Sequence, residues 1–183
     1  MGHGLKAEAR VRLLCGCTCA LVSSVPAPAH ALEFSGGVSV GGIQVGIEPR
    51  FAVSPFAGWL WRSEGDFRLE AHNMLSIVPG DGVGFYDRTA LTLGYATKTT
   101  IVSLGPSLAI YSMPVCNIVI CNRVVGVAPG GRAHSDWYFA GPLGVSTSVH
   151  VDWTGGRSRV LPGNLVVTVT TGPVWRFRVR PNE

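Results

Sequence analysis

The chain has 183 residues, with 15 Lys and Arg against 11 Asp and Glu and a formal net charge of +4. This length favours a single domain. The basic residues are dispersed and form no cluster interleaved with aromatic residues, which argues against nucleic-acid binding. The mean hydropathy is +0.30, yet beyond the first 31 residues no apolar run reaches about twenty residues, so no membrane-spanning helix is expected.

The first 31 residues have the features of a cleaved signal peptide. Lys6, Arg10 and Arg12 form a basic start, and an apolar run of signal-peptide length follows at Leu13–Val25. Residues 29–31 read Ala-His-Ala, which fits a cleavage site. We therefore expect residues 1–31 to be removed and residues 32–183 to form the folded domain.

The five cysteines fall into two groups. Three lie in the leader, where residues 14–17 loosely resemble a lipobox. A lipobox should follow the apolar run of the signal peptide, whereas residues 14–17 lie at the start of that run. The other two are Cys116 and Cys121. In an oxidising compartment an even pair at hairpin distance predicts a disulfide, which would stabilise only a short loop. No further ligands stand at zinc-site spacing, so we expect no metal and no cofactor.

Eight segments of the remaining chain alternate in polarity with a period of two, as β-strands do. They cover residues 36–47, 50–61, 66–77, 86–96, 100–112, 123–138, 143–153 and 164–178. In the first segment Gly41 and Gly42 interrupt the apolar phase, which predicts a glycine bulge. A helix is an alternative only for 66–77, whose apolar positions fit a period of two better than 3.6. The last segment is longer than the usual five or six residues and matches the roughly 9–11 that a tilted strand needs to cross a bilayer.

The polar faces of these strands carry most of the charged residues. The predicted charge network is Arg50, Arg68, Glu70, Arg88, Arg132, Asp136, Asp152 and Arg176. A membrane barrel turns these side chains into its lumen, whereas a soluble barrel turns them to water. Buried charges must be paired. The expected pairs are Arg68 or Arg88 with Glu70, and Arg132 with Asp136 or Asp152.

The connections between the strands favour the membrane barrel. Residues 78–85, 113–122 and 154–163 are longer connections at one end of the predicted sheet, and 63–65, 97–99 and 140–142 are short turns at the other. The connection near Glu48 is short and breaks the trend. Short periplasmic turns with longer external loops are typical of outer-membrane barrels.

Outward-facing aromatic residues gather near the short-turn end. They are Trp59, Trp61, Phe67, Tyr95, Trp137, Phe139, Trp175 and Phe177. Aromatic rings prefer the headgroup zone of a membrane, so we interpret this set as an aromatic girdle. A cluster of core aromatics at one end of a soluble barrel is the alternative.

Three prolines fall within the predicted strands. Pro55, Pro106 and Pro129 each remove a donor from a strand ladder. A closed barrel has no edge strand to hold them, so we expect them at bulges or near the rims.

The segment from Thr171 to Phe177 resembles the terminal strand of small outer-membrane β-barrel proteins, and residues 105–108 resemble their inner strands. The resemblance is one of overall pattern and covers residues 32–183. In this pattern the chain is similar to barrels of the outer-membrane protein A/X type. It implies an all-β fold, an eight-stranded antiparallel up-and-down transmembrane β-barrel. Those families usually end on the aromatic residue that the outer-membrane insertion machinery reads, whereas six residues follow Phe177 here.

Three histidines, His72, His134 and His150, share the polar face with acidic residues. An acid–base or metal site is one interpretation. Structural pairing is the other, because a narrow eight-stranded barrel fills its lumen with side chains. Ser148 and His150 lie two apart on one face, but such a pair is too common to indicate a nucleophile and its base. We expect no catalytic residues.

These patterns predict an exported, outer-membrane protein with a structural or surface-interaction role, without enzymatic activity. Its expected partners are the lipid bilayer, the insertion machinery and an unidentified partner at the external loops, with the loop between Cys116 and Cys121 as the contact point. Two alternatives remain open: a soluble exported barrel that binds a lipophilic ligand, and a lipid-modifying membrane-barrel enzyme.

Overall fold

The computed structural model describes residues 32–45, 48–62, 66–80, 82–116, 121–155 and 165–178. The eight strands are β1 (Leu32–Val45), β2 (Glu48–Arg62), β3 (Phe67–Val78), β4 (Gly84–Ala96), β5 (Thr100–Cys116), β6 (Cys121–Ala140), β7 (Leu143–Trp153) and β8 (Leu165–Arg178). The predicted signal peptide lies outside the described residues. None of the described residues forms a helix long and apolar enough to cross a membrane.

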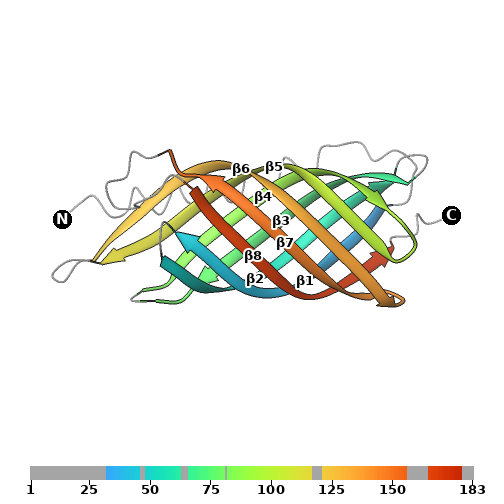
Figure 1. Ribbon diagram of the computed structural model, residues 1–183, viewed down its shortest axis with the longest axis horizontal. Coiled ribbons are helices and arrows are strands. Elements are labelled where there is room, and N and C mark those ends of the chain that lie inside the picture. The colour runs from blue at the N-terminus through green and yellow to red at the C-terminus, as the bar shows by residue number, and fades with distance from the viewer. Residues whose placement is uncertain are drawn as a thin grey trace.

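Each strand pairs with the next in antiparallel register, and β1 pairs with β8, so the sheet closes into a barrel. Figure 1 shows the strands inclined to the long axis of this barrel. Closure gives every strand a hydrogen-bonded neighbour on both sides and leaves no open sheet edge, as the hydrocarbon interior of a membrane demands. The predicted eight-stranded up-and-down fold is confirmed, and residues 67–78 form a strand and not a helix.

The two faces of the barrel wall have the predicted orientation. Leu93 and Val149 point outward, with exposed fractions of 61% and 37%. Arg68 and Arg88 point into the barrel and are 4% and 0% exposed. Apolar side chains therefore cover the outside and charged side chains fill the inside, the reverse of a soluble barrel.

The predicted bulge at Gly41 and Gly42 is wrong. The register between β1 and β2 runs without a shift through both glycines. Alternation therefore continues, and Ile43 is fully buried inside the barrel while Gln44 is exposed. The apolar residues after the glycines simply line the interior near this end, where the lumen contains apolar side chains.

The prolines do not lie at register shifts; the register shift in the β6–β7 ladder falls between Tyr138 and Ala140. Instead, each proline faces an interruption in one of its two ladders. Pro55 pairs with Val38 on β1, while the β2–β3 ladder skips from Val53 to Phe56. The β4–β5 ladder likewise has no pairs at Pro106, and the β6–β7 ladder begins one residue after Pro129. The missing proline N–H is thus accommodated by a local gap in one ladder, with the register kept.

A glycine precedes the proline at Pro106 and also at Pro173, where the β1–β8 ladder has no pairs. A Cβ on Gly105 would lie 2.2 Å from the Leu91 carbonyl oxygen, and one on Gly172 would lie 2.2 Å from the Val38 carbonyl oxygen. Real Cβ contacts do not reach such distances. The neighbouring backbone approaches too closely for any other residue, so these glycines are needed where the strands crowd together.

The interior contains two apolar clusters as well as polar side chains. The outer cluster lies toward the 79–83 and 154–164 end and comprises Ile43, Ala52, Val78, Tyr86, Ala109, Tyr111, Met113, Ala128 and Val166. The inner cluster lies toward the short turns and comprises Leu60, Ala96, Ile101, Tyr138 and Val174. The lumen is therefore layered, with a polar middle between two apolar layers.

The connections differ from those predicted at one place. Strands β5 and β6 extend to Cys116 and Cys121, so the expected connection at 113–122 shrinks to residues 117–120. The β5–β6 hairpin instead extends as paired strand, as Figure 1 shows at the left. The connections at the opposite end span residues 63–66, 97–99 and 141–142.

Candidate functional site

The outer half of the polar middle is organised by Arg88. Its Nε donates to Asp152 Oδ2 at 2.7 Å, its Nη1 to Ser76 Oγ at 3.0 Å and its Nη2 to Thr168 Oγ1 at 2.6 Å. The guanidinium also lies 4.5 Å from the centre of the Tyr86 ring. Both charged side chains of the ion pair are fully buried. This arrangement is a satisfied structural ion pair that ties β4 to β7 and β8.

The inner half of the polar middle is organised by Glu70. Its carboxylate lies 3.6 Å from Arg132 Nη1 and accepts hydrogen bonds from Thr92 and Ser103, each at 3.2 Å. Glu70 Oε2 also lies 3.3 Å from His134 Nδ1. Side chains of three other strands, β4, β5 and β6, therefore converge on this one carboxylate of β3.

Ser103, His134 and Asp136 form the arrangement closest to a catalytic site. Ser103 Oγ lies 2.6 Å from His134 Nδ1, and His134 Nε2 lies 2.9 Å from Asp136 Oδ1. A nucleophile, a base and an orienting acid stand in this order in hydrolases. Here Ser103 and His134 are 3% and 5% exposed. The pocket at the short-turn end is lined by residues other than Ser103, His134 and Asp136. This pocket therefore gives a substrate no access to the serine.

The other two histidines do not join the acidic residues. Both ring nitrogens of His72 and of His150 lack a hydrogen-bond partner among the described residues. The His72 ring stacks on Phe56 at a centroid distance of 5.4 Å. Within the described part of the chain, no group of three His, Cys, Asp or Glu residues is placed to hold a metal ion. The two histidines are packed as buried rings.

The ion pairs differ from those expected. Glu70 pairs with Arg132, and the partner of Arg88 is Asp152. Arg68 bonds to Glu33, which the sequence reasoning missed because the first strand was predicted to begin only at residue 36. Arg50 lies far from Glu33 and Arg68, at the end of the barrel opposite the short turns. It lies next to Gly80 and is only half-buried. Side-chain alternation assigns a residue to a face, but only the barrel closure decides which charges meet across the lumen.

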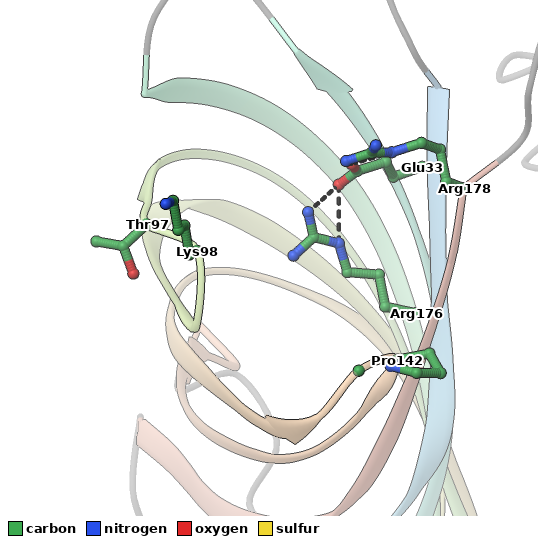
Figure 2. A pocket seen from close by; sticks show the side chains of 7 residues that line it. Glu33, Thr97, Lys98, Pro142, Arg176 and Arg178 are labelled. Carbon is green, nitrogen blue, oxygen red and sulfur yellow. Dashed lines mark hydrogen bonds and ion pairs between the residues drawn. The ribbon is translucent and has the colours of Figure 1, made fainter.

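Glu33 is the centre of a charged group at the short-turn mouth of the barrel. Its carboxylate accepts from Arg68 Nη1 at 2.8 Å, from Arg176 Nε at 2.8 Å and also from Arg176 Nη2. Arg178 Nη2 reaches the other carboxylate oxygen at 3.2 Å. Figure 2 shows Glu33, Arg176 and Arg178 on one side of a pocket and Lys98 on the other. The pocket has a volume of about 570 Å³ and is lined by Glu33, Thr97, Lys98, Gly141, Pro142, Arg176 and Arg178.

The predicted girdle residues lie on the outer surface near the short-turn end. Phe67 and Tyr95 pack edge to face at 6.0 Å, and Trp137 and Phe139 are 63% and 69% exposed. Trp59, Trp61, Trp175 and Phe177 complete the set, each exposed or half-buried. Phe34 was missed for the same reason as Glu33, and its ring lies 5.6 Å from Trp59 and 6.4 Å from Phe177.

Asp87 places an acidic side chain on the outer surface of β4. Asp87 follows the outward phase of β4, and Asn73 Nδ2 donates to its Oδ1 at 2.8 Å. Asn73 also lies 3.3 Å from Thr89 Oγ1. The amide thus compensates for a carboxylate on the otherwise apolar wall.

The backbones of Cys116 and Cys121 face each other as the last pair of the β5–β6 ladder. Their side chains lie outside the described residues, so the disulfide stays a prediction.

No family model and no curated protein matches the sequence. Solved structures match the fold. The N-terminal β-barrel domain of Pseudomonas aeruginosa OprF has a TM-score of 0.55 at 11% identity, covering 79% of this chain and 97% of that one. Neisserial surface protein A has a TM-score of 0.53 at 11% identity, covering 83% and 98%. Ail, the attachment invasion locus protein of Yersinia pestis, has a TM-score of 0.53 at 11% identity, covering 81% and 99%. The chain has the fold of the small eight-stranded outer-membrane β-barrels.

Proposed function

We propose that this chain is an outer-membrane β-barrel with a structural or surface-interaction role and a lumen closed by side chains. The observation that carries the proposal is the distribution of side chains over the closed barrel. Apolar residues face outward on all eight strands, and the buried ion pairs lie inside. The likeness to solved outer-membrane barrels supports the same placement.

Lipid contact follows from the outer surface. Leu91, Leu93 and Leu104 are 51%, 61% and 68% exposed and lie on neighbouring strands. Soluble monomers rarely expose an apolar patch beyond a few hundred Å², whereas an apolar band flanked by aromatic girdles is what a membrane barrel presents to lipid. Phe51, Phe85 and Trp153 are exposed near the opposite end and form a sparser second belt there.

A soluble barrel that carries a lipophilic ligand fits the described residues less well. Such a protein needs an apolar cavity inside. The pocket at the barrel mouth is lined mainly by charged and polar residues, and the polar middle is filled by hydrogen-bonded side chains. The two apolar clusters consist of packed, buried side chains.

A closed lumen is the reason to favour a role without conductance or catalysis. An eight-stranded barrel is just wide enough for side chains to fill it, and here an apolar layer lies on either side of the polar middle. Ser103, which has the geometry of a nucleophile, lies within this filled region. Ser103→Ala and His134→Gln are therefore expected to leave envelope lipids unchanged.

Export, insertion and a loop partner belong to the same proposal. Residues 1–31 act as the signal peptide, and the insertion machinery reads β8, whose last outward aromatic residue is Phe177. The tip of the β5–β6 hairpin is the contact point for a surface partner, because loops on a rigid scaffold carry function.

Cell fractionation combined with electrophoresis tests the proposal. The protein should be recovered with membranes, and detergent should be needed to extract it. Without boiling it should migrate as a compact species that shifts on heating, because the closed ladder resists unfolding. Recovery in the soluble fraction without detergent would contradict the membrane assignment.

A further inference from the structure

We infer that the pocket at the short-turn mouth binds the phosphate group of an anionic ligand. Among the described residues, cationic side chains outnumber carboxylates in its lining. It is formed by the start of β1, the end of β8 and the turns at 97–99 and 141–142.

The charge balance of the mouth is positive. Among the described residues, three cationic side chains line the pocket together with one carboxylate: Lys98, Arg176 and Arg178 with Glu33. Their mutual repulsion is reduced when an anion enters. Because the mouth opens between barrel walls of low dielectric, its field is focused and attracts anions from solution.

The donors suit a phosphate group. Arg176 and Arg178 each turn Nε and Nη2 toward Glu33, which is the edge of a guanidinium that binds carboxylates and phosphates through two parallel bonds. Lys98 lies across the mouth from both arginines, on the β4–β5 turn, so a ligand in the pocket meets cations from two sides (Figure 2).

Glu33 has a dual effect on such a ligand. It holds Arg176 and Arg178 in a converging geometry, and it is also the internal anion that a ligand competes with. Arg178 is the most accessible of the three arginines that contact Glu33, with its side chain 56% exposed. An incoming phosphate is therefore expected to engage Arg178 and Lys98 first, at the rim.

The pocket volume of about 570 Å³ accommodates a small organic phosphate. The phosphate group can belong to a soluble ester or to an anionic lipid headgroup that reaches over the rim beside the aromatic girdle. The chemistry of recognition is the same for both sources, and the experiment separates them.

Calorimetric titration of the folded, full chain in uncharged detergent with glycerol 3-phosphate tests the soluble source. We expect saturable binding with a Kd of about 1 mM or tighter, weakening as NaCl is raised. The same chain in lipid nanodiscs with and without phosphatidylglycerol tests the lipid source. A higher melting temperature in the discs with phosphatidylglycerol than in those without it, together with no binding of the soluble ester, assigns the pocket to a headgroup.

Two variants and a control make the test specific. Lys98→Gln combined with Arg178→Gln should weaken binding about tenfold or more, because both exposed cations are lost. Arg123→Gln, an exposed arginine of β6 near the opposite end, should bind as the wild type does. Glu33→Gln should bind several-fold more tightly, since the competing charge is removed.

Several results would overturn the inference. One is the absence of saturable binding to both phosphate sources. Another is equal binding by the wild type and the Lys98, Arg178 double variant. This comparison changes only exposed side chains, so it does not depend on whether the Glu33 variant folds. Binding in detergent does not require residence in a membrane, so this result is independent of the fractionation result above.

Discussion

At the scale of single residues, the buried charges contribute mainly by being paired. Arg88 and Asp152 are both fully buried and lie 2.7 Å apart. Water cannot reach either group, so removing one partner leaves the other unpaired in a low-dielectric interior. The hydrogen bonds from Arg88 to Ser76 and Thr168 use the rest of its donors on neighbouring strands.

Replacing Arg88 with Met should lower the free energy of unfolding by about 3–5 kcal/mol, because the Asp152 carboxylate stays buried without a cation. Urea unfolding in detergent micelles measures this change. Arg123→Met is the control: Arg123 is exposed and donates to Ser112 and Val83, so its loss should cost about 1 kcal/mol or less. Combining Arg88→Met with Asp152→Leu should restore part of the loss; a double variant less stable than the single one would argue against this pair as the cause.

At the scale of strands, close approach of backbones is as restrictive as side-chain pairing. The β4–β5 ladder is interrupted at Pro106, and the neighbouring strand crowds against Gly105. The β8–β1 ladder repeats the arrangement at Gly172 and Pro173. A glycine and a proline in sequence thus mark a place where a strand loses one donor and gains a close neighbour.

Gly105→Ala should destabilise the barrel by about 1–3 kcal/mol, because its Cβ would press on the Leu91 carbonyl and force β4 and β5 apart. Thermal unfolding of the two proteins in the same detergent checks this. Gly131→Ala is the matched control in the adjacent strand, where the new Cβ would find its nearest atom at 3.8 Å, an ordinary contact. Equal losses for both variants would show that crowding is not the cause.

The β5–β6 hairpin allows a second test at this scale. Replacing Cys116 and Cys121 together with Ser should change the melting temperature of the barrel little, because the pair ends a ladder that continues through all seventeen residues of β5. A thiol-labelling assay on the unreduced wild type should find both cysteines protected if they are bonded. A large fall in barrel stability would contradict a local role for this pair.

At the scale of the whole molecule, the outer surface determines the environment of the barrel. Its exposed leucines, valines and aromatic rings would be a liability in water and are favourable in lipid. The interior has the opposite character, because it holds charged side chains. Burial of these charges is tolerated only because they form ion pairs with each other. The closed barrel makes both conditions possible at once.

Leu104→Arg tests the environment directly. Leu104 is 68% exposed, so in a soluble protein the change should be nearly neutral. On a lipid-facing wall it should cost up to about 2–4 kcal/mol, depending on depth. Refolding equilibria in vesicles measure the difference. Val83→Arg, exposed in the connection 79–83, should have a small effect, and equal small effects at both positions would contradict lipid contact.

The sequence by itself determined the strands and their two faces, because alternation with a period of two is a local property. It predicted β7 to the residue and gave the outward phase of Leu93 and Val149. The bulges predicted from local interruptions, as at Gly41 and Pro55, were wrong. A strand can accommodate a glycine or a proline without a register shift.

Only the tertiary structure decided which charges meet. Arg88 pairs with Asp152 and Arg68 with Glu33 because closure brings β4 opposite β7, and β3 near β1, across the lumen. The separation of these partners along the chain carries no local signal. The same holds for the apolar layers and for the basic mouth, where residues from β1, β8 and two turns converge. Alternation assigns a side chain to the inside of the barrel, and the geometry of closure then selects its neighbours.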